Sequence, residues 1–374
     1  MKKFILISPK NRTAYNFRGD LIREIIAAGY EVIVTGPNKD NVEKIENLGA
    51  RFVEIPMNKN GINPFSDLLY LWRLYRLMRK EHIDVSLGYT IKPVIYGSIA
   101  ARMAGVECRN AMITGAGYLF AKQDFKAMLL RWLSFFLYKI GLGCASNVIY
   151  QNIDDLNEFV GHKLCKQKKC YVVNGSGVNM TKYHSSVYPA IPTFFMLGRM
   201  IYSKGVMDFL QAAKIVKDKY PQTRFMILGK IDPLMYDSVK QEDIDPYIKS
   251  GIVEHFPETD NIAAYYAQCS VFVLPTAYRE GTPRVILEAM SSARPIITTY
   301  TPGCKETVID GDNGFFVSVH DPNALASRMI YFIKHPDKIV EMGESSLRLC
   351  RKKYEITVIN KVMCSIMKIN DNKC

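Results

Sequence analysis

The stretch Tyr278-Arg-Glu-Gly-Thr-Pro-Arg-Val-Ile-Leu-Glu-Ala-Met290 lies between two short apolar runs, Val271–Leu274 and Ile296–Thr299. The apolar runs are typical of buried strands, and the Gly-Thr-Pro turn follows the first of them. Pro283 is well placed to begin a helix, because the first turn of a helix does not use the N–H that proline lacks. The stretch therefore predicts a strand, a turn, a helix and a second strand, which is the repeating unit of a parallel sheet.

The same alternation of short apolar runs and helical stretches extends along the whole chain. The predicted strands are Phe4–Ile7, Glu31–Val34, Arg51–Ile55, Val85–Leu87, Ala111–Ile113, Asn147–Tyr150, Phe194–Leu197, Phe225–Leu228, Ile252–Phe256, Val271–Leu274 and Ile296–Thr299. Strands of this kind form parallel sheets with both faces covered, so the pattern predicts two Rossmann-like, doubly wound α/β domains. We expect the domains at residues 1–188 and 189–353, because Pro189 and Pro192 interrupt the pattern between Ser185 and Thr193.

Glu280 and Glu288 stand on either side of the predicted helix start. The exposed N–H groups and the positive dipole of that start suit an anion such as a diphosphate. Glu288 lies roughly 7 to 8 Å further along the axis, with its side chain slanting back toward the start. This spacing suits a nucleotide sugar, with Glu280 toward the hexose hydroxyls and Glu288 toward the ribose hydroxyls. Alternatively, Glu280 caps the helix and Glu288 is a surface residue, although its apolar neighbours disfavour that interpretation.

The spacing of Glu280 and Glu288 resembles the Glu-x7-Glu motif of family 4 glycosyltransferases. Gly198-Arg199-x4-Lys204-Gly205 is similar to the diphosphate clamp of that family, and Thr301–Val317 resembles the loop and hairpin that follow the second glutamate. Ile113-Thr-Gly-Ala-Gly-Tyr-Leu-Phe120 is more loosely similar to a segment of bacterial members that extend polyprenyl-diphosphate-linked glycans for capsule, O-antigen or glycoprotein glycan. The similarity is close over residues 190–345 and looser before them.

The resemblance implies a GT-B fold, in which two domains face a cleft and a C-terminal helix, residues 354–374 here, crosses back to the first domain. It implies catalytic roles for Glu280, Arg199 and Lys204, and donor-binding roles for Gly198, Gly281, Thr282, Pro283 and Glu288. It implies an acceptor or phosphate loop with Asn16, Arg18, Gly115, Gly117 and Tyr118. The segment Lys10–Gly19 lacks the Gly-Gly pair found in many members. Asn16 and Arg18 therefore have an alternative interpretation as a helix N-cap and a solvated arginine.

The predicted chemistry follows from the charge of the leaving group. Cleavage of a sugar–diphosphate bond leaves negative charge on the nucleotide, which fixed cations can stabilise without a metal. Arg199 offers a bidentate fork and Lys204 a point charge. The six histidines are scattered, so we expect no metal and no cofactor beyond the nucleotide sugar, for which the resemblance implies UDP. The resemblance also implies retention of anomeric configuration. Glu280 either positions the hexose and stabilises a cationic anomeric carbon or acts as a covalent nucleophile, and both routes stay open.

The basic charge of the chain is concentrated in its first half. Residues 1–190 hold 26 lysines and arginines against 15 acidic residues, a net charge of +11, whereas the remainder carries only +2. Two stretches in that half, Leu68–Lys80 and Phe125–Lys139, read as amphipathic helices rich in basic and aromatic residues. We expect an anionic membrane surface as the partner, although ordinary scaffold helices would give a similar pattern. Nucleic acid is disfavoured, because no reader motif is present.

The expected location is the cytoplasmic face of the plasma membrane. Nine cysteines at irregular spacings favour reduced thiols, and no run of 18 apolar residues free of charge is present to span a bilayer. Three functions remain open at this point. They are a retaining transferase that moves a hexose or N-acetylhexosamine from a UDP-sugar to a polyprenyl-diphosphate-linked saccharide, a UDP-sugar epimerase with the same fold, and an inactive subunit that binds glycan. The basic first half disfavours the epimerase, and the four intact motif residues disfavour the inactive subunit.

Overall fold

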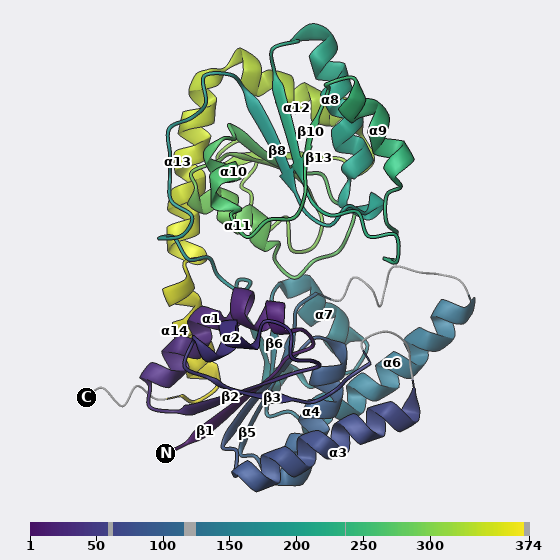
Figure 1. Cartoon of the computed structure of the whole chain (residues 1–374), viewed down its shortest axis with the longest axis vertical. Coiled ribbons are helices and arrows are strands. Elements are labelled where there is room, and N and C mark those ends of the chain that lie inside the picture. The colour runs from purple at the N-terminus through teal and green to yellow at the C-terminus, as the bar shows by residue number, and fades with distance from the viewer. Residues whose placement is uncertain (59–62, 116–124, 236, 370–374) are drawn as a thin grey trace. The chain divides into compact units, whose positions relative to one another are not determined.

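A computed structural model of the chain describes residues 1–58, 63–115, 125–235 and 237–369. The chain divides into two units: Met1–Ser176 together with Thr357–Cys374, and Gly177–Ile356. Each unit is built on its own parallel sheet with helices around it (Figure 1). The predicted pair of Rossmann-like parallel-sheet domains is therefore confirmed.

The described strands of the first unit form a sheet in the order β3-β2-β1-β4-β5-β6-β7. Their bounds are β1 Lys3–Ile7, β2 Glu31–Gly36, β3 Arg51–Glu54, β4 Val85–Tyr89, β5 Cys108–Ile113, β6 Asn147–Tyr150 and β7 Cys170–Val172. The strand order reverses between β1 and β4, which pair in parallel. The loops that follow these two strands therefore begin side by side at the carboxyl edge of the sheet, where ligands of such folds bind.

Helices cover both faces of this first sheet. They are α1 Asn11–Ala27, α2 Val42–Glu46, α3 Pro64–Glu81, α4 Ile91–Ala104, α6 Phe125–Cys144, α7 Ile153–Gly161 and α14 Ile356–Ile366, with a 3₁₀ turn at Gln167–Lys169. Along β1, Phe4 and Leu6 belong to the core cluster with α1 and α14, whereas Ile5 and Ile7 belong to the cluster with α3 and α4. Alternate residues of the strand thus face two helical layers, which explains its uninterrupted apolar sequence.

The end of the chain belongs to the first unit. Ile359 and Met363 of α14 pack in the same core cluster as Leu6. Two carbonyls at the end of this segment accept hydrogen bonds from the sheet: Ile366 O from Asn147 Nδ2 at 3.0 Å and Met367 O from Cys108 Sγ at 3.2 Å. These bonds satisfy carbonyls that a helix leaves without partners at its C-terminus.

The described strands of the second unit form a parallel sheet in the order β10-β9-β8-β11-β12-β13. Their bounds are β8 Thr193–Leu197, β9 Arg224–Leu228, β10 Glu254–Phe256, β11 Val271–Leu274, β12 Ile296–Thr299 and β13 Gly314–Val317. The helices are α8 Val206–Lys219, α9 Gln241–Lys249, α10 Ala263–Ala267, α11 Arg284–Ser291, α12 Pro322–Lys334 and α13 Pro336–Lys353, with a 3₁₀ turn η2 at Tyr202–Lys204. The strands β8 and β11, which precede the two principal motifs, are neighbours.

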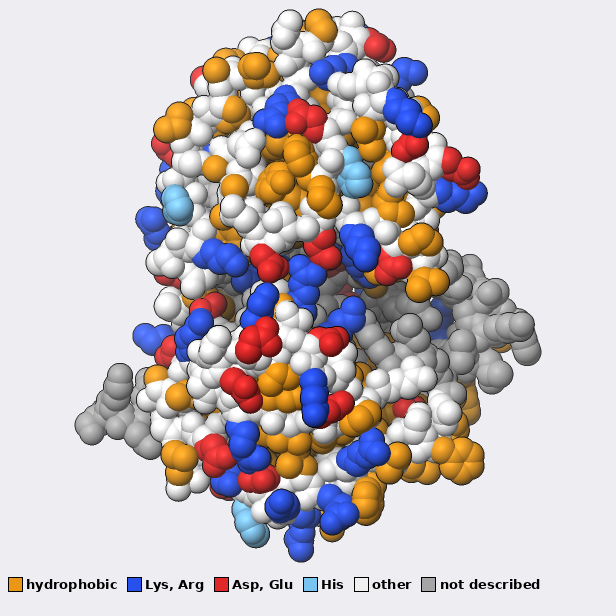
Figure 2. All heavy atoms as spheres, viewed as in Figure 1, with side chains coloured by type: hydrophobic (Ala, Val, Ile, Leu, Met, Phe, Trp, Pro, Cys, Tyr) orange, Lys and Arg blue, Asp and Glu red, His pale blue; other side chains and the backbone are white. Residues whose placement is uncertain are grey.

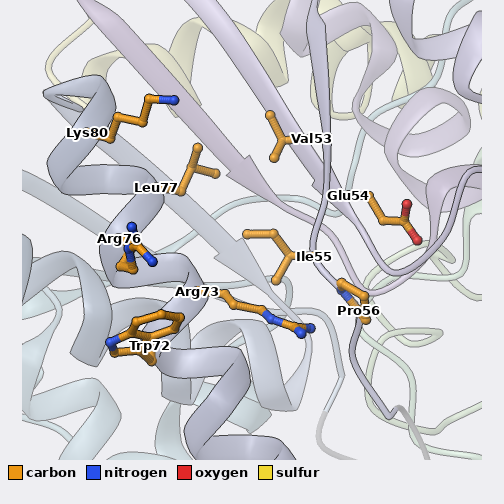
Figure 3. A pocket seen from close by; sticks show the side chains of 9 residues that line it. All are labelled: Val53, Glu54, Ile55, Pro56, Trp72, Arg73, Arg76, Leu77 and Lys80. Atoms are coloured by element: carbon orange, nitrogen blue, oxygen red, sulfur yellow. The ribbon is translucent and has the colours of Figure 1, made fainter.

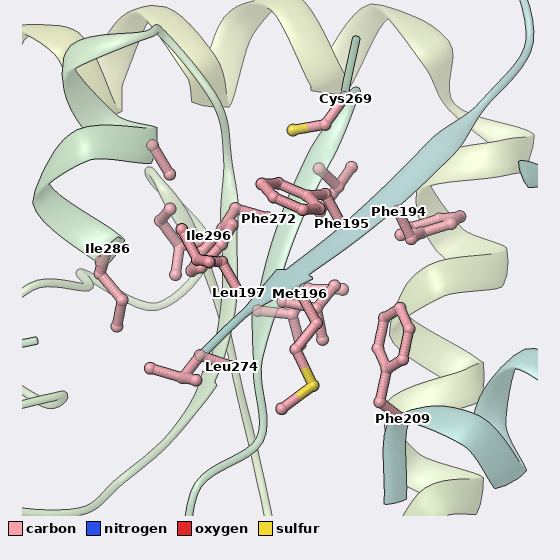
Figure 4. Packing of buried hydrophobic residues seen from close by; sticks show 14 of the residues in the cluster. Phe194, Phe195, Met196, Leu197, Phe209, Cys269, Phe272, Leu274, Ile286 and Ile296 are labelled. Atoms are coloured by element: carbon pink, nitrogen blue, oxygen red, sulfur yellow. The ribbon is translucent and has the colours of Figure 1, made fainter. Parts of the chain in front are cut away.

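The core of the second unit is rich in aromatic side chains that extend from β8 (Figure 4). The rings of Phe194 and Phe225 stack with centroids 5.4 Å apart, and Phe195 meets Phe272 edge-on at 5.9 Å. Aromatic pairs of this kind contribute roughly 0.5–1.5 kcal/mol each beyond the area that they bury. The central strands therefore form a well-packed base for the loops at their carboxyl ends.

The division after Ser176 falls earlier than the predicted boundary at residue 188. The segment that follows it packs on the second unit: the Tyr188 hydroxyl donates to Ala293 O at 2.6 Å, and the buried Arg294 donates to Ser186 Oγ at 2.6 Å. Pro189 and Pro192 interrupt the regular secondary structure, but they do not determine the boundary. The boundary depends on these contacts, which join residues more than 100 positions apart.

Strand β13 corrects the expected hairpin after the second glutamate. It pairs with β12 in parallel, from Ile296 opposite Gly314 to Thr299 opposite Val317. A hairpin would place consecutive strands antiparallel, whereas a parallel pair needs a crossover of about a dozen residues or more. The loop between Thr299 and Gly314 is long enough for that crossover. The edge strand β7 was likewise absent from the predicted strands, because Cys170–Val172 is short and largely exposed.

Candidate functional site

The motif residues of the second unit lie at the carboxyl edge of its sheet. Gly198 and Arg199 follow β8 directly, and the segment Pro275–Pro283 leads from β11 to α11. Two backbone bonds join these loops, because Ser203 O accepts from Ala277 N at 2.8 Å and from Tyr278 N at 3.0 Å. The two segments that sequence analysis singled out are therefore held against each other at the edge where such sheets bind ligands.

Lys204 and Glu280 form an ion pair between Nζ and Oε1 across these loops. Their side chains are only 7% and 17% exposed, so the pair is shielded from water. Lys204 ends η2, and the next residue, Gly205, has a φ of 78°. A Cβ on Gly205 would lie 2.1 Å from Pro275 O, so this position accepts only glycine. The glycine of the motif thus allows the lysine loop to approach the β11 loop closely.

Arg199 is exposed, and its guanidinium carbon lies 5.1 Å from the centre of the Tyr278 ring. Lys204 Nζ lies 5.9 Å from the same ring. Tyr278 therefore lies near both predicted clamp cations, at distances typical of cation–π contacts. Sequence analysis gave no role to Tyr278, although its place two residues before Glu280 was the signal available. Gly198 has open space where a Cβ would be, so its backbone can be approached by a ligand.

Helix α11 begins at Arg284, one residue later than predicted, and Pro283 precedes it. Pro283 O accepts from Ile286 N at 3.0 Å, and Gly281, Thr282 and Pro283 are buried. The loop after β12 supports this turn, because Glu280 N donates to Pro302 O at 3.3 Å. Gly303 has a φ of 87°, and its Cβ would lie 2.3 Å from Gly281 O. This glycine permits the two loops to touch through their backbones.

Glu288 is buried, with only 5% of its surface exposed. Its Oε1 accepts from Arg284 Nε at 3.2 Å, and its Oε2 lies 3.2 Å from the Tyr266 hydroxyl. Burial raises the pKa of Glu288, while Arg284, Tyr183, Tyr266 and Lys182 oppose that rise. The alternative interpretation of Glu288 as a surface residue is wrong, and the partners expected for a buried carboxylate are present.

The predicted residues of the first unit are only partly described. Asn16 lies half-buried inside α1, so it is not an N-cap, because the helix begins at Asn11. Arg18 is buried, with its guanidinium carbon 5.4 Å from the Tyr89 ring, and so is not a solvated arginine. Gly115 is exposed two residues after the end of β5 with a φ of 126°, and Gly117 and Tyr118 lie outside the described residues.

A polar cluster that sequence analysis missed lies at the carboxyl ends of β1 and β4. The Tyr89 hydroxyl is 2.5 Å from Ser8 Oγ and 2.9 Å from Thr13 Oγ1. Tyr89 also lies under Arg18, so one tyrosine joins the end of β4 to the first turns of α1. Across the described ranges of both units, no group of three His, Cys, Asp or Glu side chains is arranged to hold a metal ion.

Two protein-family models match the chain and together span most of it. The family described as glycosyl transferase 4-like matches residues 5–152, and the family described as glycosyl transferases group 1 matches residues 191–335. The second match contains Gly198, Arg199, Lys204, Glu280 and Glu288.

Curated relatives are similar over most of their length. The N,N′-diacetylbacillosaminyl-diphospho-undecaprenol α-1,3-N-acetylgalactosaminyltransferase of Campylobacter jejuni is 25% identical over 337 residues, covering 86% of this chain and 87% of the relative. The UDP-Gal:α-D-GlcNAc-diphosphoundecaprenol α-1,3-galactosyltransferase of Escherichia coli is 26% identical over 84% of this chain and 81% of the relative. The capsular polysaccharide biosynthesis glycosyltransferase CapM of Staphylococcus aureus is 25% identical over 82% and 81%.

Solved structures of similar fold cover nearly the whole chain. HepE of Anabaena, crystallised in complex with UDP and glucose, matches with a TM-score of 0.80 at 15% identity, over 98% of this chain and 100% of that one. A glycosyltransferase of Rickettsia africae matches with a TM-score of 0.79 at 17% identity, over 100% and 99%. These likenesses establish the GT-B architecture. The chain belongs to the glycosyltransferases, with a glycosyl transferase 4-like first half and a glycosyl transferases group 1 second half.

Proposed function

We propose that the protein is a retaining glycosyltransferase that moves a hexose or N-acetylhexosamine from a UDP-sugar to a saccharide linked to a polyprenyl diphosphate. The observation that carries the proposal is the shielded pair of Lys204 and Glu280 beside Arg199, directly before the start of α11, with Glu288 inside that helix. The names of the relatives from C. jejuni and E. coli each specify an acceptor on diphospho-undecaprenol, which supports the acceptor class.

The donor would lie over the start of α11. Its diphosphate would accept hydrogen bonds from the N–H groups at the helix start and contact Arg199 and Lys204. Glu288 would accept hydrogen bonds from the ribose hydroxyls, and Glu280 would face the hexose. This order follows the sequence of groups along a nucleotide sugar, with one carboxylate at each end and cations at the diphosphate.

In the reaction, the bond between the anomeric carbon and the diphosphate oxygen breaks, and the acceptor hydroxyl oxygen forms a new bond on the same face. The acceptor proton passes to the leaving diphosphate, whose charge Arg199 and Lys204 stabilise. No metal ion takes part in this proposal. Retention is supported by the α-1,3 linkage in the names of both relatives, because a UDP-hexose such as UDP-galactose is itself α-linked.

The ion pair of Lys204 and Glu280 has a role before the donor arrives. Both side chains are shielded from water, so removal of either one would leave the other as an unpaired buried charge. The diphosphate would share Lys204 and leave the Glu280 carboxylate available to the developing positive charge of the hexose. Donor binding and the electrostatics at the anomeric carbon are therefore coupled through one contact.

We also propose that α3 and α6 of the first unit attach the protein to an anionic membrane surface. Helix α3 buries Tyr70, Leu74 and Met78, so the scaffold interpretation explains one side of it. Large apolar side chains remain exposed on both helices: Phe65, Leu68, Leu69 and Trp72 on α3, and Met128, Trp132, Leu133, Phe136 and Ile140 on α6. Both helices pack against α4. Figure 2 shows hydrophobic side chains at the lower right of the first unit, where α3 begins in Figure 1.

A basic hollow beside these exposed side chains suits a phosphate-bearing headgroup. It has a volume of about 620 Å³ and lies between the edge strand β3 and α3 (Figure 3). Its lining comprises Val53, Glu54, Ile55, Pro56, Trp72, Arg73, Arg76, Leu77 and Lys80. Arg73 extends across the hollow toward Pro56, and Arg76 lies 4.8 Å from the Trp72 ring. Basic groups beside exposed aromatic and aliphatic side chains favour an interface with anionic lipid. None of the described helices is both long and apolar enough to cross a membrane.

The proposal is tested by incubating purified protein with a panel of UDP-sugars, with and without detergent-solubilised polyprenyl-diphosphate saccharides, and measuring UDP release. Wild type is compared with Glu280→Gln and with Lys214→Met, an exposed position on α8. Acceptor-dependent release that is lost in Glu280→Gln and kept in Lys214→Met supports the transferase. Conversion of one UDP-sugar into its epimer without acceptor would instead establish the epimerase. Glycan binding without either reaction would establish the inactive subunit.

A further inference from the structure

Glu288 is enclosed by side chains from three different parts of the second unit. Tyr266 comes from α10, Arg284 from the first turn of α11, and Tyr183 from the segment that precedes β8. We call Tyr183, Tyr266 and Arg284 the Glu288 cage. Tyr266 and Tyr183 are buried, and their rings meet edge-on with centroids 5.9 Å apart. The carboxylate therefore has little freedom to rotate.

All three side chains of the cage contact the Glu288 carboxylate. Arg284 Nε donates to Oε1, and the Tyr266 hydroxyl lies near Oε2 but also 2.8 Å from Val285 O. A tyrosine hydroxyl has one proton, so it can donate to only one of these two acceptors at a time. Arg284 is always charged and is thus the permanent donor. The Tyr183 side chain also hydrogen-bonds the carboxylate. A carboxylate has about four acceptor sites, so at least one direction remains for a ligand beside these three contacts.

The cage is itself anchored. Ser291 Oγ donates to Tyr183 O, which joins the end of α11 to the segment that carries Tyr183. Arg294 Nε donates to Tyr266 O at 3.0 Å, which joins the turn after α11 to α10. The three elements around Glu288 are therefore connected by bonds other than those to the carboxylate, and they hold it from fixed positions.

We propose that Arg284, aided by Tyr266 and Tyr183, is a positioning residue that holds the Glu288 carboxylate so that its remaining acceptor direction faces the hydroxyls of the donor ribose. The inference rests on the donor-binding role of Glu288 in the proposed function. A ribose hydroxyl is a hydrogen-bond donor, and a carboxylate held in one orientation can accept from it without first having to be ordered. Arg284 does not touch the ligand in this account and acts through Glu288.

Burial raises the pKa of Glu288, and every charged or titratable group that faces it opposes that rise: Arg284 on its own helix, Tyr266 on α10, and Tyr183 and Lys182 on the preceding segment. Removal of Arg284 would raise the pKa further, so less of the ionised form would be present at a given pH. The ionised form returns as pH increases. Loss of ribose recognition in the variant should therefore be greatest at low pH.

The test is the affinity for UDP and for 2′-deoxy-UDP, measured by calorimetry between pH 6 and 9 for wild type, Arg284→Met, Arg284→Lys, Glu288→Gln and the Arg284→Met/Glu288→Gln double variant. Wild type should prefer UDP by about tenfold, since a hydrogen bond to a charged group is lost with the 2′-hydroxyl. Arg284→Met should reduce that preference most strongly at the lowest pH, with recovery as pH rises. Arg284→Lys should retain most of it, and Arg284→Met should change nothing further in the Glu288→Gln background.

Two results would overturn the inference. An Arg284→Met variant that binds both nucleotides equally more weakly, with the tenfold preference unchanged, would give Arg284 a purely structural role. A Glu288→Gln variant with the wild-type preference would remove Glu288 from the ribose site. Neither of these binding measurements depends on catalysis. A protein that binds UDP with this preference but transfers no sugar would contradict the proposed function, whereas the role of Arg284 in positioning Glu288 would still be supported.

Discussion

Lys204 Nζ is paired with Glu280 Oε1 although the two residues stand 76 positions apart in the sequence. The pair spans the loops after β8 and β11, and both side chains are largely shielded from water. The predicted diphosphate clamp and the predicted hexose carboxylate are thus parts of one electrostatic unit. A substitution at either residue should therefore change the electrostatic environment of the other.

Replacement of Lys204 by Met should lower kcat roughly 100-fold or more, because one fixed group that stabilises the leaving charge is lost. Glu280 would also lose its buried partner. The measurement is UDP release at saturating donor and acceptor. Lys214→Met, which removes an exposed lysine from α8, should leave kcat unchanged. Equal activity of Lys204→Met and the control would contradict the clamp.

Replacement of Gly303 by Ala should destabilise the fold and disturb the site together. Gly303 has a φ of 87°, and its new Cβ would lie 2.3 Å from Gly281 O and 2.7 Å from Glu280 O. Backbone strain alone costs about 1–3 kcal/mol, and displacement of the Glu280 loop adds to it. Gly311→Ala is the matched control, because Gly311 has a φ of 78° with no atom within 4 Å of the new Cβ.

Urea unfolding and the transfer rate together separate the two effects. Gly311→Ala should lower the free energy of unfolding by the strain alone and keep its activity. Gly303→Ala should lose more stability and most of its activity. If the two variants lost the same stability and both stayed active, close backbone contact between the loops would not matter for the site.

Replacement of Glu288 by Gln should stabilise the protein relative to wild type as pH rises. The folded-state pKa of Glu288 is raised by burial above its ordinary value of 4.5. The contribution of Glu288 to the free energy of unfolding of wild type is therefore fully present below the ordinary pKa of 4.5. This contribution is lost as pH rises through the raised pKa of the folded state. The advantage of Glu288→Gln in unfolding free energy should be larger at pH 8 than at pH 4. A difference independent of pH would mean that the carboxylate does not titrate as its burial implies.

Charge reversal on α3 should weaken attachment to anionic vesicles. The double variant Arg73→Glu/Arg76→Glu replaces two cations beside the exposed Trp72 with two anions. Loss of the cations alone should cost about 2 kcal/mol, so vesicle affinity at low salt should fall roughly 30-fold or more. The matched control is Lys214→Glu/Lys219→Glu, which makes the same change in net charge at exposed positions on α8 of the second unit. The vesicle affinity of both double variants is measured by co-sedimentation with vesicles of phosphatidylglycerol and phosphatidylcholine. Equal loss in the two variants would indicate a general charge effect without a defined surface.

Several features could be predicted from the sequence because they depend on neighbouring residues. The strand Ile296–Thr299 has the predicted bounds, since a buried parallel strand is a short apolar run. Helix α3 begins at Pro64, four residues before the predicted stretch Leu68–Lys80. The local signal for this start is Asn63, whose Oδ1 accepts hydrogen bonds from Phe65 N and Ser66 N. Gly205, the last residue of the predicted clamp, has a φ of 78°, a conformation for which glycine is the usual residue.

Other features could not be predicted because they depend on residues that are distant in the sequence. The pairing of Lys204 with Glu280 and the enclosure of Glu288 by Tyr183 arise only when loops from different strands meet. The parallel placement of β13 follows from the path of a long crossover, which no local pattern fixes. The boundary after Ser176 likewise follows from contacts of Ser186 and Tyr188 with the turn after α11.

The central claim is retaining transfer from a UDP-sugar to a polyprenyl-diphosphate-linked saccharide. Its most direct test is the anomeric configuration of the product, determined by NMR after reaction of purified protein with a UDP-α-sugar and the lipid-linked acceptor, with Glu280→Gln as the inactive control. The account predicts a new α linkage that forms only with active protein and acceptor. A β linkage, or an α product formed equally by Glu280→Gln, would contradict it.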